Sequence, residues 1–159
     1  MKFISYWNWL NEIFSDDTDP VKDMGIGNKV RIEKWLTDMN IKSYQLTDDL
    51  KINVYDDVFL TRKFDGNLPE YIQFNLVRGA FAVAYCNMTS LRGCPYLIWG
   101  YFNCSYNNLT TLEYSPKEVH RTRQGSGAFH CQYQKNGKKF TAEEVDAYCN
   151  VEGRVVVWK

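Results

Sequence analysis

The chain has 159 residues, the usual size of a single domain, and is long enough to bury a continuous apolar core. Its 19 basic and 19 acidic residues cancel, so no overall charge attracts it to nucleic acid or to an anionic membrane. Aromatic residues make up 16% of the chain, and this excess favours a binding function because Tyr and Trp are enriched at interfaces.

Residues 1–24 are predicted to form an aromatic helical extension. In MKFISYWNWLNEIF, large apolar residues recur at helical spacing, and Trp7 and Trp9 belong to this stripe. The segment is too short to span a membrane, and the acidic SDDTD that follows disfavours an anionic bilayer surface. Two interpretations stay open: the helix packs on its own domain, or its Trp side chains bind a groove on a partner or on a second copy of the chain.

The rest of the chain, 25–159, is predicted to be one repeat domain. It divides into a helix and hairpin that cap one end at 29–57, repeats at 58–134, and a C-terminal cap at 135–159.

The first cap combines a helix with two strands. A helix is expected from Gly27 to Asn40, with Asn28 as its N-cap and Trp35 on its apolar face. SYQLTDDLKINV then predicts two short strands around a turn at Asp48-Asp49. Asp56-Asp57 predicts a second turn, which is a far commoner use of paired Asp residues than an acid/base site.

A repeat of 21 residues follows. VRGAFAVAYCNMTSLRGCPYL, from Val77, aligns with IWGYFNCSYNNLTTLEYSPKE, from Ile98, and a shorter copy appears at GAFHCQY. A degenerate copy precedes them at DVFLTRKFDGNLP. The matched positions place Phe81, Phe102 and Phe129 in one column, with Val83, Cys104 and Cys131 in the next. Asn87 and Asn108 are expected to turn the chain after each strand.

A period in the low twenties is typical of leucine-rich-repeat-like solenoids, in which each coil holds a short strand and a turn. Phe102 and Cys104 alternate with Tyr101, Asn103 and Ser105, so one strand face is apolar and the other can meet solvent. No single coil can bury its apolar face alone, whereas stacked coils can. The predicted fold is therefore α+β: a short leucine-rich-repeat-like β-solenoid with helical caps at both ends.

The unit FNCSYNNLTTLEYSPKEV resembles the repeat of small leucine-rich-repeat-like proteins of tailed phages. VRIEKWLTDMNIKSYQLTDDLKINVYDDVFL is similar to the helix and hairpin before the repeats in that family, and GKKFTAEEVDAYCNVEG to its C-terminal cap. The resemblance covers about residues 29–157. It implies the solenoid architecture and a phage origin, but the family has no general activity to transfer.

The C-terminal cap is predicted from helix signals. Thr141 and Glu144 form a capping box that starts a helix reaching about Cys149, and Gly153 is expected to end it. RVVVW then predicts a last strand.

The five Cys are odd in number and include no Cys-x-x-Cys pair, which is typical of a reduced, cytosolic protein. The chain opens without a signal sequence, so a cytoplasmic location is expected and its Asn-x-Ser/Thr sequons are not expected to carry glycans. Cys104 and Cys131 are predicted to be buried, where a thiol acts as a small apolar side chain. The Cys and His residues lack the paired spacings of zinc sites, so no metal or cofactor is predicted.

The outward face of the strands is the predicted partner-binding site. Its candidate residues are Tyr101, Asn103, Ser105, His130 and Gln132, beside Ala80, Ala82 and Ala84. Small side chains next to Tyr, Asn and His allow close approach and adaptable hydrogen bonds to a protein surface. An ordinary solvated sheet face would show the same pattern.

These observations predict a non-enzymatic protein-binding module. No Gly-rich phosphate loop or nucleophile elbow is present, and neither His has a recognisable catalytic setting. With the phage resemblance, the expected partner is a host protein, such as a defence or regulatory protein. The alternative is a nucleic-acid-binding regulator that uses Arg121, Arg123, Lys138 and Lys139.

Overall fold

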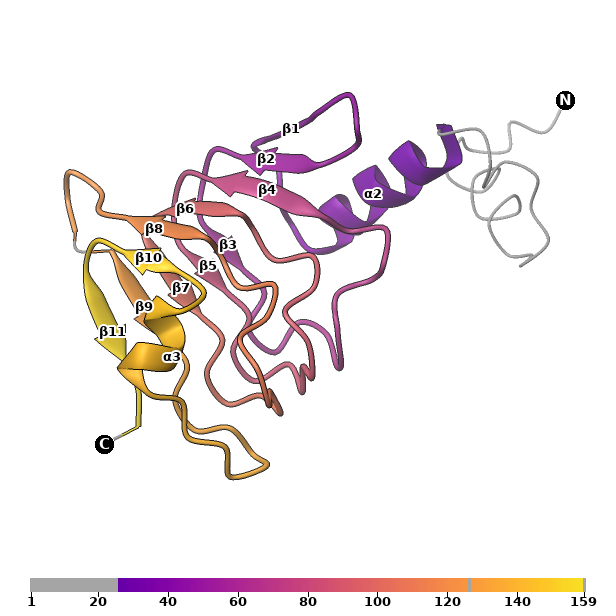
Figure 1. Ribbon diagram of the computed structural model, residues 1–159. Helices are drawn as coiled ribbons and strands as arrows, with labels where there is room; N and C mark the ends of the chain where they lie inside the picture. The colour runs from indigo at the N-terminus through magenta and orange to yellow at the C-terminus, as the bar shows by residue number, and fades with distance from the viewer. Residues whose placement is uncertain (1–25, 126, 159) are drawn as a thin grey trace, which may run out of the picture.

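The structure is a computed structural model that describes residues 26–125 and 127–158. Over this range the chain winds into a β-solenoid of five coils, each of which gives one strand to each of two sheets (Figure 1). The predicted solenoid is confirmed. The predicted N-terminal helical extension, with Trp7 and Trp9, lies outside the described residues.

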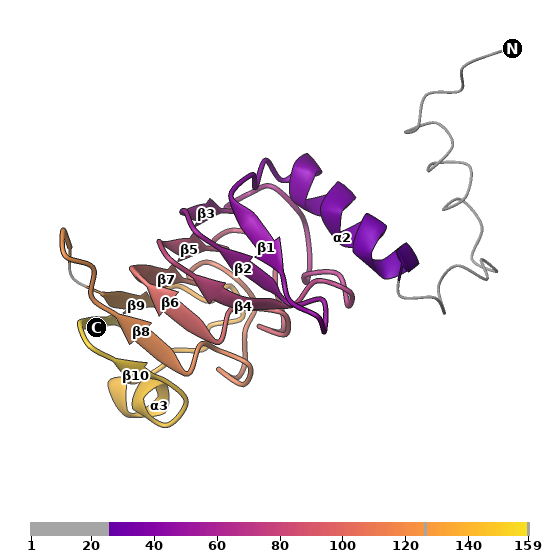
Figure 2. The same ribbon diagram turned by 90° about the horizontal axis from the view of Figure 1, so that it is seen from above.

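Two sheets lie face to face along the stack. Sheet A contains β1 (Tyr44–Leu46), β2 (Ile52–Val54), β4 (Phe74–Val77), β6 (Leu97–Trp99), β8 (Glu118–His120) and β10 (Asn150–Val151). Sheet B contains β3 (Val58–Phe59), β5 (Phe81–Ala82), β7 (Tyr101–Asn103), β9 (Ala128–His130) and β11 (Arg154–Val156). All neighbours are parallel except β1 and β2, which form the predicted hairpin (Figure 2).

The interior is built from columns that run through the coils. Phe81, Phe102 and Phe129 are paired in register and fully buried, as the repeat predicts. The ring centroids of Phe81 and Phe102 lie 6.2 Å apart and those of Phe102 and Phe129 lie 5.0 Å apart. Cys104 and Cys131 are buried in the next column, as expected. Each coil therefore buries its apolar side chains against the coils above and below it.

Glycine residues occupy the corner between the two sheets. Gly79, Gly100, Gly127 and Gly153 precede β5, β7, β9 and β11. A Cβ atom at Gly100 would lie 2.6 Å from the carbonyl oxygen of Gly79, and one at Gly153 would lie 1.5 Å from that of Gly127. The coils can stack this closely only because no side chain is present there. The prediction that Gly153 ends the last helix is therefore wrong.

A buried asparagine holds neighbouring coils together. The Asn107 side-chain oxygen accepts hydrogen bonds from the backbone N–H groups of Cys86 and Met88, at 3.0 and 3.1 Å. Its NH2 group donates to the carbonyl oxygens of Val83 and Cys104, at 2.9 and 3.0 Å. All four side-chain bonds satisfy backbone groups at the turn after the strand. The expectation that Asn108 performs this role is wrong by one residue.

Gln134 repeats this arrangement one coil further along. Its side-chain oxygen accepts a hydrogen bond from the backbone N–H of Leu109 at 3.0 Å, and its NH2 group lies 3.3 Å from the carbonyl oxygens of Cys104 and Cys131. A longer amide side chain therefore takes the place of Asn107 in the fourth coil.

Helices lie at the two ends of the described chain. Helix α2 (Ile26–Asp38) lies at the end of the stack next to β1 and the first coil (Figure 2), and Trp35 meets Phe74 edge to face at a centroid distance of 6.2 Å. Because α2 begins before Asn28, that residue is helical and is not the predicted N-cap. Helix α3 (Ala142–Asp146) starts with the predicted Thr141 and Glu144 capping box but ends three residues before Cys149.

Candidate protein-binding surface

Tyr101, Asn103, His130 and Gln132 lie together on the outer face of sheet B. Asn103 pairs with His130 across the β7–β9 ladder, and the rings of Tyr101 and His130 meet edge to face at 6.1 Å. All four side chains are partly exposed. The structure therefore brings four of the predicted site residues into one patch, which we call the sheet B patch.

Ser105 and the three alanines do not belong to the exposed surface. Ala80, Ala82 and Ala84 are nearly fully buried, and so is Ser105, whose hydroxyl accepts a hydrogen bond from the backbone N–H of Gln132 at 3.1 Å. Adjacent strands lie only about 4.8 Å apart, so the taller side chains of neighbouring coils cover these short ones. The prediction that Ser105 contacts a partner is wrong, because its hydroxyl is used within the fold.

Most side-chain polar groups of the sheet B patch form no hydrogen bond within the described chain. The side-chain oxygen of Asn103 accepts one hydrogen bond from the backbone N–H of Ser105 at 3.0 Å, and the side-chain NH2 group takes no part in it. Among the described residues, no hydrogen bond engages that NH2 group, the Tyr101 hydroxyl, the His130 ring or the side-chain amide of Gln132. These groups project from a rigid parallel sheet and can bond to another molecule without breaking an internal contact.

The electrostatic setting keeps this patch neutral. Burial raises the pKa of the Tyr101 hydroxyl, and the Asp57 carboxylate adds to the increase. Burial also lowers the pKa of His130, and the Arg154 guanidinium contributes to the decrease. Both side chains are therefore uncharged near pH 7, and a partner can cover them without removing a charge from water.

A row of aromatic rings borders the sheet B patch. The row, which we call the tyrosine ladder, consists of Tyr85, Tyr106, Tyr133 and Trp158. The centroids of Tyr85 and Tyr106 lie 4.1 Å apart, and those of Tyr106 and Tyr133 lie 4.8 Å apart, with nearly parallel rings. Trp158 then meets Tyr133 edge to face at 4.5 Å. Three of the four side chains are exposed.

The backbone sets the position of the tyrosine ladder. Tyr85, Tyr106 and Tyr133 all have positive φ, between 54° and 59°, at the turn that follows each strand of sheet B. This left-handed conformation costs a residue with a side chain about 1 to 2 kcal/mol. Stacking of aromatic rings contributes a comparable amount, about 0.5 to 1.5 kcal/mol for each pair. The strain at each turn is therefore offset by the neighbouring ring.

Cations close both ends of the tyrosine ladder. The Arg62 guanidinium lies 4.5 Å above the Tyr85 ring, and the Lys139 ammonium lies 5.0 Å from the Trp158 ring. The sequence aligned Tyr85, Tyr106 and Tyr133 but did not predict that they stack. The signal was available, because a Tyr at the same place in successive coils must lie one strand spacing from the next.

The predicted basic region is not one surface. Arg121 and Arg123 belong to the loop between β8 and β9, whereas Lys138 and Lys139 precede α3, and the two loops lie on opposite sides of the solenoid (Figure 1). Lys138 also pairs with Glu144 at 2.6 Å. Arg121 and Arg123 therefore form one basic group and Lys138 and Lys139 another, and nucleic-acid binding stays a prediction.

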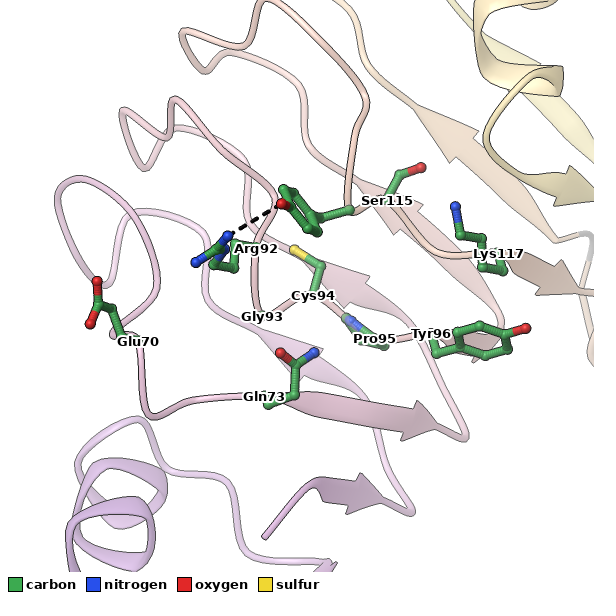
Figure 3. A pocket seen from close by; sticks show the side chains of 10 residues that line it. Glu70, Gln73, Arg92, Gly93, Cys94, Pro95, Tyr96, Ser115 and Lys117 are labelled. Atoms are coloured by element: carbon green, nitrogen blue, oxygen red, sulfur yellow. Dashed lines mark hydrogen bonds between the residues drawn. The ribbon is translucent and has the colours of Figure 1, made fainter. Parts of the chain in front are cut away.

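A cavity of about 400 Å³ lies beside the start of the sheet A strands (Figure 3). Arg92 and Lys117 line it, and the Arg92 guanidinium donates a hydrogen bond to the Tyr114 hydroxyl at 3.2 Å. The buried hydroxyl of Ser115 has no hydrogen-bond partner within the described residues. One donor of the Arg92 guanidinium is therefore used by Tyr114 within the fold.

The thiols have no chemical setting for catalysis. All five Cys are free and buried, and burial raises the pKa of Cys131 and of Cys149 to about 12. A thiol with so high a pKa is not a nucleophile at neutral pH. Over 26–125 and 127–158, no group of three or more His, Cys, Asp or Glu side chains is arranged to hold a metal ion.

No protein-family model, no curated protein and no solved structure matches the chain. Within the part of the chain that the structure describes, no helix is long and apolar enough to cross a membrane.

Proposed function

We propose that the protein is a non-enzymatic binding module whose sheet B patch and tyrosine ladder together engage a protein partner. The observation that carries the proposal is the sheet B patch, where Tyr101, Asn103, His130 and Gln132 present unused hydrogen-bonding groups from a rigid sheet. The adjoining tyrosine ladder supplies the amphipathic aromatic area that interfaces favour.

The proposed setting follows the resemblance of the repeats. We take the solenoid to be leucine-rich-repeat-like, with α2 and α3 as its helical caps, and the protein to be a phage accessory factor in the cytoplasm of an infected bacterium. The proposed partner is a host protein, such as a defence or regulatory protein. A second copy of the chain is the other candidate partner, through the aromatic segment that contains Trp7 and Trp9.

Capture from host lysate with matched variants tests the proposal. The full chain is immobilised as the parent, as a Tyr101→Ala/His130→Ala variant, and as a Tyr96→Ala control that removes an exposed Tyr from the far side of the same coils. The parent and the control should recover the same protein, and the purified partner should bind the double variant at least about tenfold more weakly, since central aromatic side chains dominate interface energies. Equal binding by all three forms would refute the proposal.

A further inference from the structure

A second hollow lies on the outer side of sheet A. Its volume is about 680 Å³, within the usual range of small-molecule sites. Residues from three successive coils line it: Leu76, Arg78, Leu97, Trp99, Arg121 and Arg123. Its floor is apolar and its rim is cationic, a combination that the sheet B patch does not show.

The loop that supplies the rim is an interruption of the repeat. In the third coil, Gly100 alone joins the strand of sheet A to that of sheet B, whereas the fourth coil uses residues 121–127 for the same corner (Figure 1). The additional residues place Arg121 and Arg123 beside the hollow. The stack of coils does not require this extension, since the shorter corner is sufficient one coil earlier.

The cations of the rim have no carboxylate partner. Among the described residues, no Asp or Glu oxygen lies within 4.0 Å of the guanidinium nitrogens of Arg78, Arg121 or Arg123. The nearby carboxylates are engaged elsewhere, because Glu118 and Glu152 each contact His120 at 2.7 Å. Glu152 also accepts a hydrogen bond from the backbone N–H of Arg121, and its carbonyl oxygen accepts one from the Arg121 Nε.

Trp99 provides a flat apolar wall to the same hollow. His120 packs on its ring at a centroid distance of 4.7 Å, and the Trp99 residue stays 43% exposed. Leu76 and Leu97, which pair in register across β4 and β6, are partly exposed beneath it. A ring-shaped apolar group can therefore lie in the hollow while an attached anion reaches the arginine side chains.

We propose that this hollow binds a nucleotide, with its base against Trp99, Leu76 and Leu97 and its phosphate on Arg121 and Arg123. Arginine presents a planar fork of donors that matches phosphate oxygens, and aromatic side chains bind the face of any base. The site is separate from the protein-binding surface, since it lies on the other sheet. The nucleotide can be free or part of a single strand, because both present a base and a phosphate.

Titration of the full chain with adenosine monophosphate tests the proposal, followed by calorimetry and by Trp fluorescence. Saturable binding is expected, and inorganic phosphate should bind at least about tenfold more weakly because it cannot use the apolar floor. Arg123→Ala and Trp99→Leu should each weaken binding about tenfold. Arg92→Ala, which removes an exposed arginine outside the hollow, should bind like the parent. Melting curves confirm that each variant is folded.

Short single-stranded RNA and DNA oligonucleotides distinguish the two sources of the nucleotide. Binding at least about tenfold tighter than that of the mononucleotide, with a steep loss in salt, supports the site and assigns it to a single strand. Equal affinity supports the site and assigns it to a free nucleotide. The absence of saturable binding by every probe would overturn the proposal, and so would binding that Arg123→Ala and Trp99→Leu leave unchanged.

Discussion

The tyrosine ladder and a second row of side chains, at the end of sheet A, have the same spacing but differ in composition. The second row, here called the tryptophan row, contains Tyr55, Arg78, Trp99, His120 and Glu152. Both rows place one side chain of each coil at the strand spacing. In the tyrosine ladder almost every coil presents a ring, and each ring covers its neighbour. In the tryptophan row the chemistry changes at every coil.

This difference in composition gives the two rows different roles. A row of like rings fills the space between coils and mainly stabilises the stack. A row of unlike residues does not stack in this way, and the 680 Å³ hollow is lined by Arg78 and Trp99 of this row and by the β8–β9 loop that interrupts the repeat. In a solenoid, the coil at which the repeat is broken is therefore the first place to look for a ligand site.

The largest loss of stability is expected from Asn107, which follows Tyr106 of the tyrosine ladder and bonds the backbone of two neighbouring coils. Asn107→Leu removes four hydrogen bonds and leaves the backbone groups of Cys86, Met88 and Val83 buried without those partners, whereas the Cys104 carbonyl keeps its bond from Gln134. The free energy of unfolding should fall by about 4 kcal/mol or more, since each such group costs about 1 to 3 kcal/mol. Urea denaturation followed by circular dichroism measures it. A loss below about 1 kcal/mol would show that Asn107 does not hold the coils together.

An intermediate effect is expected in the centre of the tyrosine ladder. Tyr106→Ala removes two stacked pairs, with centroid distances of 4.1 and 4.8 Å, and should reduce the free energy of unfolding by about 2 kcal/mol. Tyr96→Ala, at an exposed site without a ring partner among the described residues, should change it by less than about 0.5 kcal/mol. Equal losses in thermal or urea unfolding would remove the distinction between ladder tyrosines and ordinary surface tyrosines.

The smallest change in stability is expected from His120 in the tryptophan row, and it depends on pH. Hydrogen bonding to Glu152, supported by Glu118, raises the pKa of His120 above its ordinary 6.5. The folded protein therefore binds the proton more tightly than the unfolded chain, so the stabilisation is full below about pH 6.5 and is lost as the pH rises through the raised pKa.

His120→Gln tests this linkage. The variant should lose about 1 kcal/mol of stability at pH 6 and less at pH 9, because partly exposed carboxylates contribute little to a salt bridge. Urea unfolding at the two pH values measures the difference. A variant with the same loss at both values would assign the role of His120 to its packing on Trp99 and not to its charge.

The sequence predicted the parts of the fold that repeat. The Phe81, Phe102 and Phe129 column, the hairpin at Asp48-Asp49 and the Thr141 capping box each depend on residues close in sequence or matched by the repeat. It did not predict that Asn107 replaces Asn108, because adjacent Asn residues are distinguished only by which one the backbone turns inward. Strand β10 was also missed, since its two residues pair only after the preceding coil is in place.

The candidate site was harder to predict because it depends on contacts between neighbouring coils. Alternation along the strand correctly brought Tyr101, Asn103 and His130 to one face, but the burial of Ser105 depends on the height of side chains in neighbouring coils. The separation of Arg121 and Arg123 from Lys138 and Lys139 depends on the direction of two loops. Neither property is encoded in the spacing of a single coil.

The glycine residues at the corner between the two sheets also determine how the number of coils can change. The second and third coils have the same period and each places a glycine immediately below its neighbour, as Gly79 and Gly100 show. An in-frame duplication of residues 77–97 would insert one further coil with its own glycine, phenylalanine and tyrosine in register. Both ends of the stack would keep their present neighbours. The interaction area of this architecture can therefore grow by gene duplication, one coil at a time, without the design of a new core.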